Sequence, residues 1–161
     1  MTTTTTRQPT CASTDASPVW HFDHVNVSTG DGSALSALFE DVMGLQNGYR
    51  PPFPFPGQWL YAEGQAVVHA ITDASHSQNA GAVTFGHIAF RSDQPAASLI
   101  EKLRCSGLSF RVSRVPEDNT AQIFVLLPGN FVVELNVPDD EYLPKDHVYS
   151  ASQASPGSQL L

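Results

Sequence analysis

Apolar and polar residues alternate with a period of two in many short segments of the chain, a pattern typical of β-strands that bury one face. The prolines between residues 50 and 57 remove backbone donors, so we expect a loop or rim there. The predicted strands cover residues 20–27, 45–49, 58–62, 66–71, 83–91, 108–115, 121–127 and 131–137.

Two other segments have the apolar spacing of a helix, and each ends at a glycine, Gly44 or Gly107. We expect the first helix to cover one face of a sheet. The apolar residues with this spacing are Leu35, Leu38, Phe39 and Val42 in the first helix, and Ala97, Ile100 and Leu103 in the second.

The two parts of the chain repeat each other. The segment 22–29 returns as 85–92, with His24 and His87 in the third place and 63 residues apart. Later in each part, residues 64–69 return as 129–134, so that His69 corresponds to Glu134 at a spacing of 65. Each half therefore has the order strand, helix and further strands, and the predicted fold class is α+β with two βαβββ modules.

The composition divides the chain into a core and two polar ends. Residues 1–18 are mostly Thr, Ser, Ala and Pro, which predicts a disordered N-terminal tail. We place one domain at residues 19–138, with modules at 19–72 and 83–138, and a C-terminal tail at 139–161.

The chain of 161 residues has a formal net charge of −8 and a pI near 5.0, which argues against nucleic acid as a partner. No apolar stretch approaches the roughly 18 residues of a membrane span, and the N-terminus lacks the apolar core of a secretory signal. Cys11 lies in the predicted tail and Cys105 in a predicted helix, so we do not expect them to form a disulfide. These features predict a cytoplasmic protein without a membrane partner.

Four residues with ligand-type side chains stand at matched places in the two modules. His24 and His87 lie in the first strands, and His69 and Glu134 lie in the last strands. A lone histidine in a strand is more often structural, and an amphipathic strand can turn Glu134 to solvent. The matched placement favours a shared site, and this donor set suits a divalent ion such as Zn, Fe, Mn, Ni or Co.

The duplication, together with the segments 23–25 (Asp-His-Val), 86–88 (Gly-His-Ile) and 133–135 (Val-Glu-Leu), resembles the vicinal oxygen chelate superfamily. That superfamily includes glyoxalase I, methylmalonyl-CoA epimerase, extradiol dioxygenases and fosfomycin-resistance thiol transferases. The resemblance covers about residues 19–137. It implies a cupped sheet around a metal ion, a small-molecule substrate and a homodimer.

The resemblance leaves three functions open. The spacing of His69, His87 and Glu134 is similar to that of bacterial glyoxalase I, which favours a lyase or isomerase that stabilises an enediolate or oxyanion. In that enzyme the metal ligands would be His24, His69, His87 and Glu134, with Glu134 or His69 as the base. The set of His24, His87 and Glu134 alone resembles that of an Fe(II) or Mn(II) extradiol-type dioxygenase. The third alternative is a small-molecule binding or resistance protein without metal turnover.

Residues near the predicted site are candidates for contact with the substrate. Arg50 would pair with a carboxylate or phosphate. The alternative is that the aromatic residues belong to the core or to a dimer interface, and that Arg50 is solvated. The candidate substrate-binding residues are Asn26, Arg50, Phe53, Trp59 and Tyr61.

Overall fold

The computed structural model describes residues 18–73, 81–139 and 147–149. Its strands form one mixed sheet of nine strands in the order β2-β3-β4-β1-β5-β8-β7-β6-β9. The first module consists of β1 (His21–Thr29), α1 (Ser33–Leu35), η1 (Ser36–Val42), β2 (Gln46–Gly48), β3 (Gly57–Ala62) and β4 (Gln65–Ile71).

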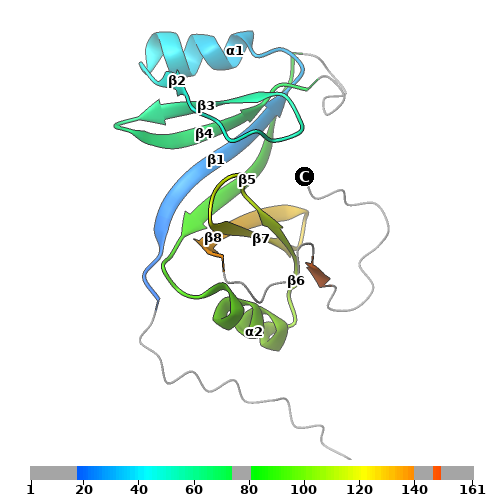
Figure 1. Ribbon diagram of the computed structural model, residues 1–161. Helices are drawn as coiled ribbons and strands as arrows, with labels where there is room; N and C mark the ends of the chain where they lie inside the picture. Colours follow the sequence, from blue (N-terminus) through cyan, green and yellow to red (C-terminus); the bar gives the residue numbers. More distant parts are fainter. Residues whose placement is uncertain (1–17, 74–80, 140–146, 150–161) are drawn as a thin grey trace, which may run out of the picture.

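The second module repeats this order, and Figure 1 shows the two helical segments at opposite ends of the curved sheet. Its elements are β5 (Val83–Arg91), α2 (Ala96–Ser106), β6 (Ser109–Arg114), β7 (Thr120–Leu127) and β8 (Phe131–Pro138), followed by β9 (His147–Tyr149). The structure confirms the predicted α+β fold with two βαβββ modules in a cupped mixed sheet. Among the described residues, no helix combines the length and apolar character of a membrane span.

The strand pairing has the symmetry of the sequence repeat. The first strand of each module runs parallel to the last, so β1 pairs with β4 and β5 pairs with β8. The two first strands, β1 and β5, lie side by side and antiparallel in the middle of the sheet. This arrangement brings the histidine-bearing strands of both modules together.

Helix α2 covers the second module with an apolar core. Leu99, Ile100 and Leu103 are buried against strand residues that include Ile123 and Val125. The helix ends at Gly107, whose φ of 71° lies in the left-handed region that favours glycine. Burial of this face, rather than helix propensity alone, stabilises α2.

The first helical segment differs from the prediction. Leu35 is 4% exposed, whereas Leu38 is 49% and Val42 is 77% exposed. After Leu35 the chain continues as the π-helix η1, with its wider turn, and the Met43 amide donates to the Leu38 carbonyl at 3.0 Å. An apolar stripe at α-helical spacing therefore does not stay on one face. Phe39 still packs against the smaller core of Leu45, Leu60 and Val68.

Two irregularities in the pairing of β1 with β5 occur at the buried residues His24 and Asn26 of β1. Register shifts occur between Phe22 and Val25 and between Asn26 and Val27. Such bulges bend a strand and redirect its side chains. Gly86 is required at the second one, because a Cβ there would collide with the side-chain oxygen of Asn26.

The predictions for the two tails and for the cysteines can also be compared with the structure. Most of the two predicted tails lies outside the described residues, and β9, which pairs with β6, falls within the predicted C-terminal tail. The absence of a disulfide was predicted wrongly, because Cys105 is disulfide-bonded; its partner lies outside the described residues. The domain boundaries stay a prediction.

Candidate metal centre

Three buried side chains converge on the concave face of the sheet, where the two modules meet. His87 Nε2 lies 2.7 Å from Glu134 Oε2 and 3.3 Å from His24 Nε2, and His24 Nε2 lies 3.8 Å from Glu134 Oε2. Ligand atoms bound to one ion at roughly 2.0–2.2 Å lie about 2.8–3.6 Å apart, depending on geometry. The three atoms therefore need only small adjustments to share an ion.

These side chains have little contact with solvent. The exposed fraction is 1% for His24, 7% for His87 and 1% for Glu134. A buried carboxylate between two imidazoles requires a compensating charge, and two histidines with one carboxylate form a set suited to a divalent first-row ion. Among the described residues, these three form the group whose ligand atoms lie close enough to hold one ion.

Neighbouring side chains orient two of the proposed ligands, Glu134 and His24. Gln122 Nε2 donates to Glu134 Oε1 at 2.7 Å, which leaves Oε2 facing the histidines. His24 Nδ1 lies 3.5 Å from Asp23 Oδ2, and this carboxylate favours a proton on Nδ1, so that the Nε2 lone pair is free for a metal. These hydrogen bonds and contacts around the proposed ligands therefore fit a metal site.

The carboxyl groups of the site are held in the ionised form. Burial raises the pKa of Glu134, but the hydrogen bond with His87 and the charges of both histidines outweigh it and lower the pKa below its ordinary value. Burial also raises the pKa of Asp23, but hydrogen bonds from His24 and Asn136 dominate and lower it to about 2. Glu134 would bind an ion as a carboxylate, and an ionised Asp23 can accept a hydrogen bond from His24 Nδ1, so both shifts suit a metal site.

His69, predicted as the fourth ligand, does not join the group. Its ring is stacked on His24 at 3.5 Å between centroids and 25° between planes, and on Trp59 at 3.9 Å and 2°. An imidazole lone pair lies in the plane of its ring, so two stacked, nearly parallel rings cannot both point at one nearby ion. Burial, followed by the charge of His24, lowers the pKa of His69 to about 2. The structure thus brings together three of the four predicted ligands and places the neutral His69 beside them.

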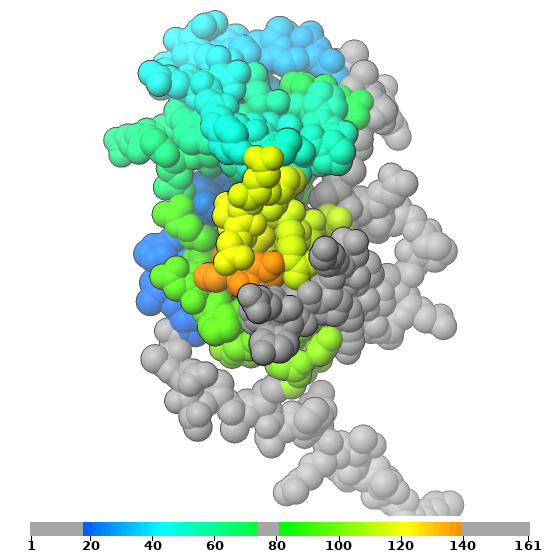
Figure 2. Space-filling model, in the orientation of Figure 1, coloured from blue at the N-terminus to red at the C-terminus, as the bar shows by residue number. Residues whose placement is uncertain are grey.

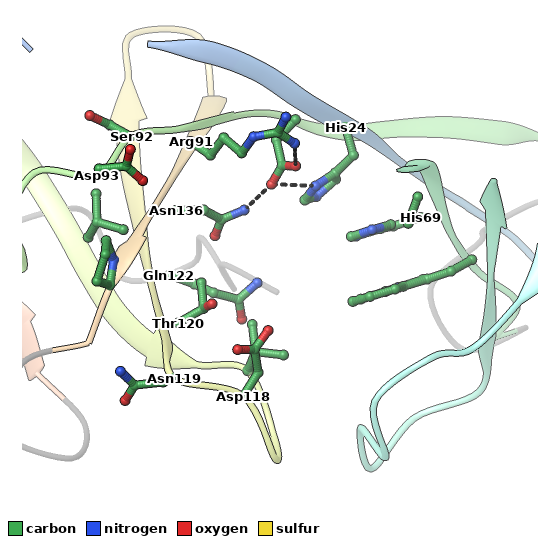
Figure 3. A pocket seen from close by; sticks show the side chains of 16 residues that line it. His24, His69, Arg91, Ser92, Asp93, Asp118, Asn119, Thr120, Gln122 and Asn136 are labelled. Atoms are coloured by element: carbon green, nitrogen blue, oxygen red, sulfur yellow. Dashed lines mark hydrogen bonds and ion pairs between the residues drawn. The ribbon is translucent and has the colours of Figure 1, made fainter. Parts of the chain in front are cut away.

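Two cavities open on the sides of this group. The larger, of about 380 Å³, is lined by His24, His69, Asp93, Asp118, Gln122 and Asn136 among others, and we call it the polar chamber. Figure 3 shows His24 and His69 on one side of it and Asp93, Asn119 and Thr120 on the other. The smaller, of about 60 Å³, is lined by Asn26, Arg50, Phe53, Phe55, Trp59 and His87 among others, and we call it the aromatic cavity.

Four of the five predicted substrate-binding residues line one or both of these cavities. Asn26, Arg50, Phe53 and Trp59 line the aromatic cavity, and Trp59 lines the polar chamber as well. Tyr61 lines neither; its hydroxyl donates to the Tyr49 carbonyl at 2.6 Å.

Arg50 is fixed by its own loop. Its Nη2 donates to the Phe55 carbonyl at 2.9 Å, and its guanidinium lies 5.1 Å and 5.0 Å from the ring centroids of Phe53 and Phe55. No acidic partner of Arg50 occurs among the residues that the structure describes. Burial lowers its pKa from the ordinary value.

The loop that carries Arg50 meets the second module across the cup. Tyr49 Oη donates to Glu117 Oε2 at 3.3 Å, and Figure 2 shows the residues near 120 in contact with the segment near 50. The site is therefore bridged on one side by a contact between the modules.

Sequence reasoning missed four residues of the site, namely Asp23, Arg91, Gln122 and Asn136. Two of them carried a signal: Asn136 follows Glu134 by two residues, and Gln122 interrupts an apolar strand. Polar residues at inward-facing strand positions indicate a site, because such residues are rarely buried without a partner. Asp23 and Arg91 are partly exposed and carried no such signal.

Comparisons with known proteins give matches among solved structures. No family model and no curated protein sequence matches the chain. Methylmalonyl-CoA epimerase from Mycobacterium tuberculosis is similar with a TM-score of 0.55 and 18% identity, over 74% of this chain and 89% of that one.

Two further similar structures belong to longer chains. A catechol 2,3-dioxygenase has a TM-score of 0.55 and 17% identity, over 79% of this chain and 42% of that chain. A Mn(II)-bound glyoxalase from Novosphingobium aromaticivorans has a TM-score of 0.53 and 15% identity, over 76% of this chain and 42% of that chain. This chain thus spans nearly all of the epimerase and less than half of each of the other two.

Proposed function

We propose, from the vicinal oxygen chelate fold that this chain has, that it is a divalent-metal-dependent enzyme acting on a small substrate with two neighbouring oxygen atoms. His24, His87 and Glu134 would hold the ion. When bound, the ion supplies a Lewis acid with open coordination positions. The structural matches support the fold, and the converging side chains support the metal.

The observation that carries the choice of reaction is the position of His69 outside the group of ligands. Two histidines and one carboxylate would leave positions on the ion open for substrate and oxygen, and this donor set is typical of non-haem Fe(II) oxygenases. This geometry favours an extradiol-type dioxygenase with a catechol-like substrate over the lyase or isomerase that a fourth ligand at His69 would indicate. Fe(II) or Mn(II) is then the expected ion.

The residues of the chain would position the substrate in this reaction. The rings of Phe53 and Trp59 line the aromatic cavity together with His87, and a planar substrate would lie against them. Gln122 keeps Glu134 oriented. His24 lines the polar chamber and His87 lines the aromatic cavity, so a substrate in either cavity would reach one of the proposed ligands.

Oxygen uptake tests the proposal directly. Protein loaded with Fe(II) or Mn(II) is incubated with a panel of catechols, and oxygen consumption is measured together with the absorbance of a ring-cleavage product. Oxygen uptake that requires both metal and catechol supports the dioxygenase. Glu134→Gln should abolish it, whereas Glu63→Gln, at an exposed turn, should not.

Two other results would replace this proposal. Exchange of solvent deuterium into a hemithioacetal or acyl thioester, without oxygen uptake, would identify the lyase or isomerase. Protein that neither carries nor takes up stoichiometric metal would instead indicate a binding or resistance protein.

A further inference from the structure

The polar chamber contains a buried hydrogen-bond acceptor without a partner. Asn136 is 8% exposed and lines the chamber, and its Oδ1 has no hydrogen bond. Its Nδ2 donates to Asp23 Oδ2 at 2.6 Å, and because a carboxylate only accepts, the amide must keep this orientation. The oxygen is therefore held in place and awaits a donor, since a buried acceptor without one costs stability.

The wall of the chamber carries an excess of negative charge. Three carboxylates line it, Asp23, Asp93 and Asp118, against the single guanidinium of Arg91, which lies 3.3 Å from Asp23. Asp93 and Asp118 have no ion-pair partner in the described ranges 18–73, 81–139 and 147–149. Figure 3 shows Asp93 and Asn136 among the side chains that line this chamber.

Arg50, whose guanidinium has no acidic partner among the described residues, lies outside this chamber. Arg50 lines the aromatic cavity and is absent from the wall of the polar chamber. The chamber thus combines carboxylates with a buried acceptor, and its volume of about 380 Å³ is within the range of small-ligand pockets. Both features select a group that is positively charged and donates hydrogen bonds.

We propose that the polar chamber binds a primary ammonium group on the substrate, with Asn136 Oδ1 accepting one hydrogen bond and Asp93 and Asp118 supplying the attraction. The inference rests on the proposed function, since His24 lines the chamber and also belongs to the metal group. The substrate class is then a catechol-like compound with a short cationic arm. A carboxylate arm is disfavoured by the same charges.

Binding measurements without turnover test this assignment. Protein loaded with Zn(II), which does not activate oxygen, is titrated under argon with catechols that carry an ethyl, an aminoethyl, a trimethylammonioethyl or a carboxyethyl arm. Affinity is followed by calorimetry and by tryptophan fluorescence, to which Trp59 in the chamber wall contributes. The ethyl compound measures the contribution of the catechol ring alone.

The charge and the hydrogen bond give separate signals. The aminoethyl compound should bind roughly two- to five-fold more tightly than the ethyl compound for each unpaired carboxylate that it approaches, and the carboxyethyl compound more weakly. The trimethylammonium compound keeps the charge but cannot donate. It should bind roughly three- to ten-fold more weakly than the aminoethyl compound.

Matched variants locate the effect in the chamber. Asp93→Asn and Asp118→Asn should each reduce the preference for the ammonium arm and leave binding of the ethyl compound unchanged. Glu117→Gln is the control, because it removes one charge from the same turn as Asp118 but is not part of the chamber wall. It should leave the preference intact.

The outcomes separate this inference from the proposed function. If the ethyl compound binds but the aminoethyl compound gains nothing over it, the ammonium assignment is overturned and the metal site stands. Equal affinity for the primary and quaternary ammonium compounds would overturn the role of Asn136. If no catechol binds to metal-loaded protein, the proposed function fails and this inference fails with it.

Discussion

Glu134 is the residue on which metal binding should depend most, because it contributes the single carboxylate of the group and is 1% exposed. Glu134→Gln keeps the shape of the side chain but removes the charge. We expect metal affinity to fall by more than roughly ten-fold, the loss that even an outer-sphere change produces. Inductively coupled plasma analysis of dialysed protein measures the occupancy, and circular dichroism checks the fold. Full retention of metal by the folded variant would exclude Glu134 as a ligand.

Gly86 should control the shape of the aromatic cavity. A Cβ at this position would collide with Asn26 Oδ1, and Asn26 lines the cavity and pairs with His87 across the strands. We expect Gly86→Ala to destabilise the protein by about 1–3 kcal/mol, as overpacking does, and to weaken substrate binding. Thermal unfolding and ligand titration measure the two effects. Gly81→Ala, where a Cβ meets no atom within 4 Å, is the matched control and should leave both unchanged.

At the scale of elements, the side chain of Leu35 in the first helical segment should contribute strongly to the free energy of unfolding, and that of Leu38 very little. Leu35 is 4% exposed and Leu38 is 49% exposed, although both belong to one apolar stripe in the sequence. Leu35→Ala should cost about 2–5 kcal/mol of unfolding free energy, and Leu38→Ala less than about 0.5 kcal/mol. Chemical denaturation measures both. Equal losses would mean that the segment winds as a regular α-helix that buries both leucines.

The sequence predicted the strands well and the helical segment poorly. The strand predicted at 83–91 is observed at Val83–Arg91, because alternation with a period of two leaves little freedom in register. The π-helical winding of Ser36–Val42 has no counterpart in a pattern that assumes 3.6 residues per turn. Local spacing also could not reveal the register shifts of β1, which depend on its neighbour β5.

The candidate site was predicted in part for a similar reason. The repeat pointed to His24, His87 and Glu134, since equivalent strands carry them to the same face. It also pointed to His69, which stands opposite Asn26 just as Glu134 stands opposite Ala89. Equivalent backbone positions do not fix side-chain direction, and the stacking of His69 between Trp59 and His24 depends on neighbours that the repeat does not encode.

At the scale of the whole molecule, all three proposed ligands come from one chain. The homodimer that the family resemblance implies stays a prediction, but the site does not require a second copy. Metal affinity should therefore be the same at nanomolar and at high micromolar protein, with one ion per chain. Titration with a fluorescent metal indicator at both concentrations, beside sedimentation velocity, checks this. Affinity that falls on dilution along with a dimer would show that the site is shared.

The adjacency of β1 and β5 has a mechanical consequence. One proposed ligand comes from the first module and two from the second, so an ion bound there would clasp the two halves of the molecule. The two modules could not separate without releasing the ion. At a free metal concentration of about 100 times Kd, binding would add about 2.7 kcal/mol to the free energy of unfolding. Removal of the ion by a chelator would then weaken the β1–β5 boundary between the modules before it affected the packing within either module.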